Sequence, residues 1–246
     1  LPCFTRQCRF EYFKMAPLTA EQLSEYRELP EKVENSLYII GIDCEMIKTT
    51  QGDEVARISA VNDQGETVID EFLRPLGEVE DYRTQVSGIT PEKVSDSSLY
   101  TSNQAVEILQ KVADQHTIIV GHSLENDLRA MKIIHDRVID TALIYNRDAR
   151  YPNKPSLSKL YSHYINKDFR VESETKGHDS VEDAKAALEL AHNALIAAVS
   201  EVEAEPQLPS LFSKMVTKEN QDNSTESTEE EEEEESNENG KKVLPK

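Results

Sequence analysis

Residues 36–46 read SLYIIGIDCEM, and this stretch decides the fold prediction. Apolar side chains and one glycine fill positions 37–42, and the run then meets Asp43 and Glu45. Because alternate residues of a strand share a face, both carboxylates point to the same side, whereas the apolar residues cover both faces. A strand that is apolar on both faces is typical of the centre of a sheet. We therefore expect a central strand whose C-terminal end presents two carboxylates to a cleft or to the interior.

The remaining sequence predicts a mixed α/β sheet. Two strand patterns follow the first and are joined by the turn sequence DQG, which indicates an antiparallel meander of three strands. Short apolar strands then alternate with helical patterns, as expected of parallel strands connected by helices that cover the sheet. The expected strands are 37–46, 55–62, 66–75, 116–122 and 137–141, and the expected helices are 18–29, 102–114, 123–134, 156–165 and 180–199.

Charge is unevenly spread along the 246 residues, whose formal net charge is −20. Residues 201–246 contain 14 acidic and 5 basic residues, a net charge of −9, and include the run TEEEEEEES. This segment has too few large apolar residues to offset the conformational entropy of ordering it. We therefore expect an N-terminal extension with a short helix over 1–35, a folded domain over 36–200 and a disordered acidic tail over 201–246.

Composition also limits the class of protein. No apolar run approaches the roughly 18–20 residues of a membrane-spanning helix, and no N-terminal stretch resembles a secretory signal. We expect a soluble intracellular protein with no membrane partner. The three cysteines, Cys3, Cys8 and Cys44, do not make a disulfide framework, and Cys3 and Cys8 lack a second pair of zinc ligands nearby.

Two further carboxylates occupy unusual helical positions. Asp127 falls within or beside the apolar face of the helix expected at 123–134, which has Ser123 as its N-cap; its place in the first turn also suits the helix dipole. Asp183 lies at the edge of the apolar stripe of the last helix, behind an N-cap at Asp179. His178 directly precedes that cap, where its side chain can lean over the helix entrance.

Several ionised carboxylates in core-facing positions need a counter-charge, because burial without one raises their pKa values and costs free energy. A nearby Arg or Lys, a proton or a metal ion could supply it, and Arg57, Arg74 and Arg129 are candidate partners. Divalent cations are the most economical solution. Oxygen ligands without His or Cys indicate Mg²⁺ or Mn²⁺ rather than zinc.

An acidic chain is an unfavourable partner for nucleic acid, but residues 147–176 differ from the rest. They contain seven basic and four acidic residues, with four aromatic residues interleaved. The segment could form a phosphate-facing lip, or it could be an ordinary solvated helix and loop. Composition leaves both interpretations open.

Three motifs, taken in order, resemble the DEDDh 3′→5′ exonucleases of the DnaQ-like, ribonuclease H-like fold. They are D-x-E at 43–45, GHSLEND at 121–127 and H-x4-D at 178–183. The stretches IGIDCEM, VSGIT, VGHSLENDLRAMKIIH and VIDTALIY are similar to the RNA exonuclease (Rex-type) branch. That branch includes nuclear enzymes that trim the 3′ ends of ribosomal and transfer RNA precursors, and plant small-RNA-degrading nucleases. The resemblance covers residues 36–200.

The resemblance implies a ribonuclease H-like sheet and a metal-dependent 3′→5′ exoribonuclease. Such an enzyme releases nucleoside 5′-monophosphates from single-stranded RNA 3′ ends, in RNA processing or turnover. A nuclear location is implied by the resemblance alone, and a cytoplasmic one is expected otherwise. The implied ligands of two Mg²⁺ or Mn²⁺ ions are Asp43, Glu45, Asp127 and Asp183, with Glu45 also catalytic and His178 as general base. Met46 and Leu124 border these ligands, and we expect them to contact the terminal nucleotide.

Alternatives remain at this stage. The five site residues do not read the sugar, so a DNA 3′→5′ exonuclease fits them as well. A non-catalytic RNA-binding or scaffold domain could use the same fold. Asp140, in VIDT, is expected to cap the following turn, and His122 is expected to shape the turn before the helix at 123–134. The sequence predicts neither the natural RNA, nor the oligomeric state, nor protein partners.

Overall fold

The computed structural model describes residues 21, 24–146, 154–167 and 177–204, and the side chains through residue 200. The described residues up to Val199 form one compact unit, and of residues 200–246 only the end of the last helix is described. The expected acidic tail, Cys3, Cys8 and much of the basic segment at 147–176 lie outside the described residues. Within the described part, no helix is both long and apolar enough to cross a membrane.

The predicted mixed sheet is confirmed. Its first three long strands form an antiparallel meander, and two shorter strands continue the sheet in parallel on the other side of the first strand. The strand order is β4-β3-β2-β6-β8, and a short strand, β5, pairs with the end of β2. The strands are β2 (Ile39–Thr49), β3 (Gly52–Val61), β4 (Thr67–Phe72), β5 (Val79–Asp81), β6 (Ile118–Gly121) and β8 (Val138–Asp140).

Strand β2 is the central strand, but it does not end at the two carboxylates as expected. It continues to Thr49 because the hairpin with β3 and the pairing with β5 provide main-chain partners there. On its other side, pairing with β6 reaches only Gly41. Asp43 and Glu45 therefore extend past the carboxyl end of β6, where one side of β2 is left to a helix. Crevices outside the carboxyl ends of parallel strands are common ligand sites in α/β sheets.

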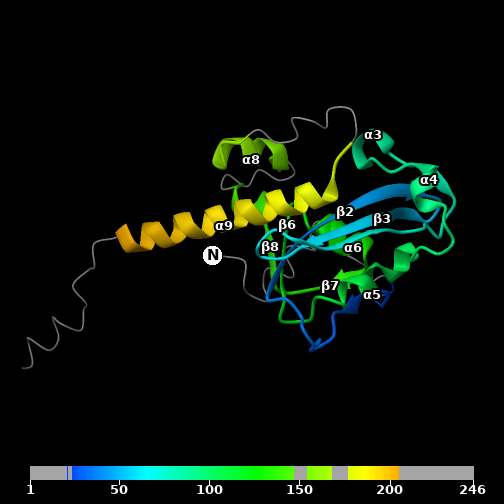
Figure 1. Ribbon diagram of the computed structural model, residues 1–246, viewed down its shortest axis with the longest axis horizontal. Helices are drawn as coiled ribbons and strands as arrows, with labels where there is room; N and C mark the ends of the chain where they lie inside the picture. Colours follow the sequence, from blue (N-terminus) through cyan, green and yellow to red (C-terminus); the bar gives the residue numbers. More distant parts are fainter. Residues whose placement is uncertain (1–20, 22–23, 147–153, 168–176, 205–246) are drawn as a thin grey trace, which may run out of the picture. The chain divides into compact units, whose positions relative to one another are not determined.

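Helices cover both faces of the sheet (Figure 1). Ile40, Ile42 and Cys44 face the larger core cluster, together with α5 (Ala105–Leu109) and residues flanking and within α6 (Glu125–Ala130). The opposite face packs against α9 (Ser180–Ala204), and α8 (Leu157–Tyr164) packs against α9 in turn. The connections contain α3 (Thr84–Ser87), α4 (Pro91–Val94), a 3₁₀ turn (Ser102–Gln104) and α7 (Thr141–Ile144).

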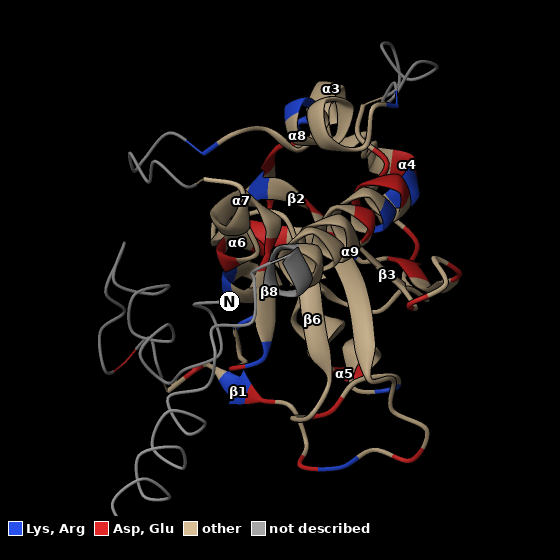
Figure 2. Cartoon of the chain, turned by 90° about the vertical axis from the view of Figure 1, so that its left-hand side faces the viewer, with Lys and Arg blue, Asp and Glu red and all other residues tan. Residues whose placement is uncertain are grey.

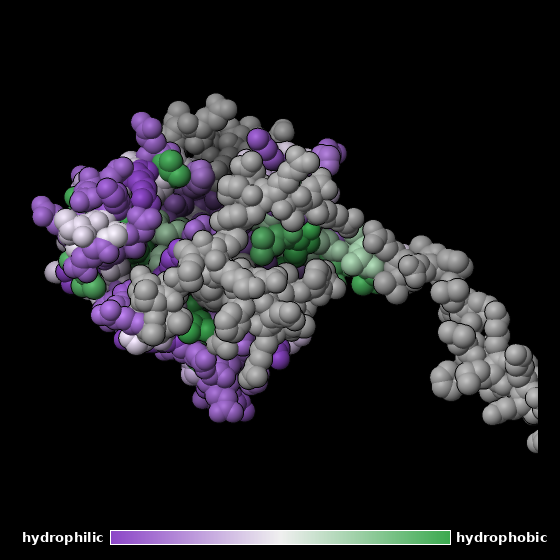
Figure 3. All heavy atoms as spheres, turned by 180° about the vertical axis from the view of Figure 1, so that it is seen from behind, coloured by the Kyte–Doolittle hydropathy of each residue, from purple (hydrophilic) through white to green (hydrophobic). Residues whose placement is uncertain are grey.

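Helix α9 crosses β2 at close range because residue 41 is a glycine. A Cβ atom at Gly41 would lie 2.7 Å from the carbonyl oxygen of Ala184 and 3.1 Å from a methyl of Val61. Farther along, α9 exposes Leu195, Ile196 and Val199. Figure 3 shows the resulting apolar surface over this half of the helix.

Three expected helices differ from the structure. The helix expected at 18–29 does not extend through its second half, because Arg27–Glu28 form strand β1, which pairs in parallel with β7 (Ile133–Ile134). Next to β1, Leu29 is buried in the main core, so tertiary contacts outweigh local helix propensity. The helix expected at 123–134 ends at Ala130, since Lys132 has a left-handed φ of 54°. The helix expected at 102–114 contracts to a 3₁₀ turn and α5.

Replacing Gly41 with alanine should destabilise the fold by about 1–3 kcal/mol, as over-packing typically does. The added Cβ would meet the backbone of α9, which cannot move aside like a side chain. Chemical denaturation would measure the stability loss, and hydrogen exchange should show α9 amides losing protection. In the control Gly65→Ala, the left-handed φ of +78° adds local strain, but the Cβ meets nothing within 4 Å in the β3–β4 turn, so the selective loss of protection in α9 should be absent. Wild-type stability in Gly41→Ala would contradict the close crossing.

Candidate active site

Two carboxylates project from β2 on the side that faces α9. Asp43 is half-buried and Glu45 is buried. In the β2–β3 pairing, Asp43 lies opposite Ser59 and Glu45 lies opposite Arg57. This register places polar residues side by side on a face that is otherwise apolar.

Asp127 reaches β2 from α6, across the side of the strand that β6 leaves open. Its Oδ1 accepts a hydrogen bond from the backbone N–H of Cys44, at 2.9 Å. Cys44 lies between Asp43 and Glu45, so this bond brings a third carboxylate to the same part of the strand. Figure 2 shows acidic residues of α6 beside β2. Burial raises the pKa of Asp127 well above its ordinary value, although the Cys44 N–H opposes the rise.

Asp140 orients α6. Its carboxylate accepts hydrogen bonds from the N–H groups of Ser123 (2.9 Å) and Leu124 (3.2 Å), and it caps α7 by accepting from Ala142 (2.8 Å). The expected capping role of Asp140 is thus confirmed, and it extends to the entrance of α6. Ser123 was expected to be the N-cap of that helix, which is wrong: it has a left-handed φ of 58°, and Leu124 occupies the cap position.

His122 shapes the turn between β6 and α6, as expected. Its Nδ1 lies 3.0 Å from the hydroxyl of Thr141, and its Nε2 lies 3.0 Å from the carbonyl oxygen of Pro155. Burial lowers the pKa of His122 to about 4. A neutral ring donates its Nε2–H to Pro155 and thereby ties the chain before α8 to the α6 turn.

The entrance of α9 carries His178 and Asp183 to the part of the sheet where β2 has its carboxylates. Ser180 contacts Ser59, which is opposite Asp43, and Ala184 lies over Gly41, so the first turn of α9 covers this part of β2. Asp183 is buried within that turn, with Oδ2 3.6 Å from Nδ1 of His178. The His178 side chain is 44% exposed.

Helix α3 holds the backbone of His178. The N–H of His178 donates to the carbonyl oxygen of Val86 at 2.6 Å. Gly177 has a φ of +79°, and a Cβ there would lie 2.6 Å from the backbone nitrogen of Gly88, so the two glycines pack face to face. The VSGIT stretch therefore supports Gly177 and His178, which lead into α9.

Negative charge accumulates around Cys44. This thiol is free and buried, and burial raises its pKa well above the ordinary value, reinforced by the nearby charges of Asp127, Asp43 and Glu45. Among the arginines considered as counter-ions, Arg57 forms its ion pairs with Asp70 and Asp179. In the described part of the chain, no three His, Cys, Asp or Glu side chains are arranged as a formed metal cluster. Their roles as ligands remain predictions.

The two residues predicted to contact the terminal nucleotide differ in their exposure to solvent. Met46 is partly exposed next to Glu45, whereas Leu124 is completely buried in the main core. Contact with a nucleotide stays a prediction for both, and only Met46 offers accessible surface here.

The described part of the basic segment contributes two lysines to ion pairs. Lys154 pairs with Glu125 at the start of α6, and Lys167 pairs with Glu189 of α9. Both pairs fix the α8 region to the domain, which favours the structural interpretation for these two residues. The basic residues at 147–153 and 168–176 lie outside the described residues.

Sequence reasoning missed a set of polar residues that joins β3 and β4 to the first residue of α9. It considered Arg57 only as a partner for Asp43 or Asp127. The available signal was polarity: Arg57 and Ser59 occupy alternate positions within 55–61, a run whose other residues are apolar. The missed set is Arg57, Ser59, Asp70 and Ser180.

Comparison with known sequences agrees with this geometry. The profile of the exonuclease family RNase_T matches residues 40–191. RNA exonuclease 1 of Saccharomyces cerevisiae is 42% identical over 153 residues, covering 62% of this chain and 27% of that protein. An uncharacterised exonuclease of Schizosaccharomyces pombe is 41% identical over 152 residues, covering 62% of this chain and 24% of that protein. The chain thus spans about a quarter of the length of these relatives.

Solved structures share the fold. The Pan2 catalytic unit of Neurospora crassa superposes with a TM-score of 0.55 at 26% identity, covering 74% of this chain and 32% of that one. The S. cerevisiae Pan2 module in complex with AACCAA RNA gives a TM-score of 0.54 at 20% identity, covering 86% and 38%. The mixed sheet of this chain is therefore the sheet of a known exonuclease fold.

NMR titration should give His122 a pKa near 4. Because this folded-state pKa is below the unfolded value of about 6.5, the neutral ring stabilises the fold fully above pH 6.5. That contribution is lost as pH falls from about 6.5 towards 4. His122→Gln should remove this pH dependence, so the stability gap between the two proteins should narrow across the window. A measured pKa near 6.5 would contradict the burial argument.

Asp140→Ala should cost roughly 2–4 kcal/mol, because three backbone N–H groups lose their acceptor at once. Asp140→Asn keeps an acceptor oxygen and should cost less. As a matched control, Asp96→Ala removes an exposed turn carboxylate that accepts from the N–H of Ser98, and should cost well under half as much. Urea denaturation would compare the three. Equal losses for Asp140→Ala and Asp96→Ala would exclude the capping of α6.

Proposed function

The chain belongs to the exonuclease family RNase_T, and from this membership we propose that it is a metal-dependent 3′→5′ exoribonuclease. Water is the nucleophile, and the bond between the terminal phosphorus and the preceding 3′ oxygen breaks. The products are a nucleoside 5′-monophosphate and an RNA shortened by one residue. The relatives named as RNA exonucleases support RNA as the substrate class.

One observation carries the proposal. Three separate elements bring acidic side chains to β2, at the edge that β6 leaves unpaired and on the face that packs against α9. Asp43 and Glu45 come from the strand itself, and Asp127 is bonded to the amide of the residue between them. Asp183 lies in the helical turn above, and His178 stands at its entrance. Such a concentration of acids at the edge of a core costs free energy unless a counter-charge neutralises it.

The donor set fits hard divalent cations. Divalent-metal dependence is general in this family. The four carboxylates Asp43, Glu45, Asp127 and Asp183 offer only oxygen ligands, and Mg²⁺ or Mn²⁺ prefer these. Two such ions, when bound, would neutralise the carboxylates and polarise the phosphodiester of the incoming RNA. Their binding would also lower the high pKa of Asp127, since a nearby cation favours the ionised form.

His178 is suited to general-base chemistry by its position. Its ring is partly exposed, so water can reach it, and its backbone is fixed by α3. The imidazole would accept the proton of the attacking water. The neighbouring Asp183 carboxylate, 3.6 Å from Nδ1, would stabilise the charged ring that results.

The proposal is tested with a 5′-labelled single-stranded RNA and its DNA counterpart, each in Mg²⁺, Mn²⁺ and EDTA. We expect a ladder that shortens from the RNA 3′ end only when metal is present. Asp43→Asn should lower the rate by roughly 100-fold or more, and His178→Ala by about 10²–10⁴-fold. Asp63→Asn, at an exposed turn, is the matched control and should cleave like the wild type.

The outcomes separate the alternatives. Faster cleavage of the DNA strand would replace the RNA assignment with a DNA exonuclease. Intact RNA in both metals, with binding retained, would favour a scaffold domain and remove the catalytic interpretation of the carboxylates. Cleavage in EDTA would exclude the metal-dependent mechanism.

A further inference from the structure

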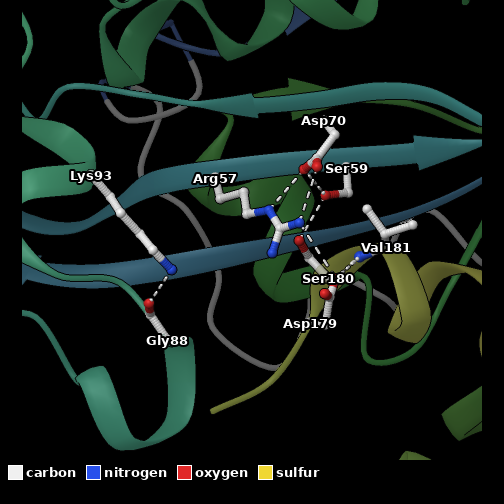
Figure 4. A network of polar contacts seen from close by, with 8 residues as sticks. All are labelled: Arg57, Ser59, Asp70, Gly88, Lys93, Asp179, Ser180 and Val181. Carbon is white, nitrogen blue, oxygen red and sulfur yellow. Dashed lines mark hydrogen bonds and ion pairs between the residues drawn. The ribbon is translucent and has the colours of Figure 1, made fainter. Parts of the chain in front are cut away.

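A polar network connects the entrance of α9 to strands β3 and β4 (Figure 4). We call its members the α9 clamp: Arg57, Ser59, Asp70, Asp179 and Ser180. Arg57 donates to both carboxylate oxygens of Asp70, at 2.7 and 3.1 Å, and its Nη2 lies 3.4 Å from Asp179. Ser59 donates to Asp70 at 3.0 Å, and the hydroxyls of Ser59 and Ser180 are 2.7 Å apart.

The direction of each bond follows from the groups present. An ionised Asp70 only accepts, and hydrogen bonding and charge from Arg57 lower its pKa despite partial burial. The single proton of Ser59 is therefore donated to Asp70. Ser180 must in turn donate to Ser59, so the bond across to α9 has one defined direction. Arg57 is itself held over the ring of Phe72, 5.3 Å from the centroid.

Ser59 and Ser180 are fully buried, whereas the nearby His178 is not. Ser59 and Ser180 have no exposed surface, but the His178 side chain is 44% exposed. A single residue, Asp179, separates His178 from Ser180, and its carboxylate accepts a cap bond from the N–H of Val181 that stiffens this turn. On the other side, the Val86 carbonyl oxygen receives the His178 N–H. The backbone of His178 is thus held from two sides.

We infer that the Ser180–Ser59–Asp70 chain of the α9 clamp is a positioning device for His178, acting through the backbone of residues 178–180. This inference rests on the proposed function, in which His178 is the general base. Ser59 and Ser180 touch neither the substrate nor the reacting atoms. Their hydroxyl bond fixes the angle at which the chain enters α9, and that angle sets the position of the His178 imidazole beside Asp183.

The physical reason is the sensitivity of proton transfer to position. A displacement of about 1 Å can cost roughly 100-fold in rate. Removing one serine leaves the other hydroxyl buried without its partner, so the turn relaxes to satisfy it. Residues deeper in α9, from Ala184 onward, are held independently by packing on Gly41 and Val61. The first displacement should therefore occur at His178.

A double-mutant cycle tests this inference on the full chain. Ser180→Ala should lower kcat by roughly 10- to 100-fold while KM and the metal concentration for half-maximal activity stay unchanged. In a His178→Ala background the same change should have little further effect, because the residue it positions is already absent. Ser59→Ala removes the same bond from the strand side and should reproduce both results.

A matched control separates positioning from stability. Ser102→Ala removes a buried hydroxyl that donates to Glu54, far from α9 in sequence, and should lower stability without changing kcat. An equal Ser180→Ala penalty with and without His178 would overturn the inference while leaving the exoribonuclease intact. A wild type without metal-dependent cleavage, or a His178→Ala variant with full activity, would instead overturn the proposed function and the inference with it.

Discussion

The structure depends on one close contact, between the backbone of helix α9 and the glycine of strand β2. Gly41 allows the carbonyl oxygen of Ala184 to lie only 2.7 Å from the position that a Cβ would occupy. This contact sets the height of the helix above the sheet. Asp183, one residue before Ala184, is buried in the same turn, so the contact at Gly41 also fixes its height above the sheet. In the proposed reaction, packing between a helix and a strand would thereby set the distance between two elements that carry proposed metal ligands.

The other side of β2 is organised by main-chain hydrogen bonding rather than packing. Because β6 stops pairing at Gly41, the amide of Cys44 is available to Asp127. Asp140 then fixes the helix that carries Asp127, through the N–H groups at its entrance. A buried carboxylate held by amides is stable in one orientation, but it retains a high pKa. Asp127 is therefore fixed in orientation, although burial disfavours its ionised form.

The sequence allowed the sheet to be predicted because period-two apolar patterns and the DQG turn are local signals. It also singled out the four carboxylates of the proposed site, since acids at apolar positions stand out against a core; their roles, and that of His178, stay predictions. Local patterns could not reveal where β2 ends, because its last residues are held by β5, or that Arg27–Glu28 pair with β7. The left-handed conformation of Ser123 could not be predicted either, because its N–H donates to Asp140, which is distant in sequence. Contacts between remote segments were the missing information.

Helix α6 is bounded by left-handed residues at both ends, Ser123 with a φ of 58° and Lys132 with a φ of 54°. Six helical residues lie between these two reversals, so the segment cannot slide along its own axis. One inserted residue would rotate everything beyond it by about 100°, given 3.6 residues per turn. Asp127 would then leave the Cys44 amide. Tolerance to insertions and deletions during evolution should therefore vanish across this short stretch, while the surface turns around it remain free to change length.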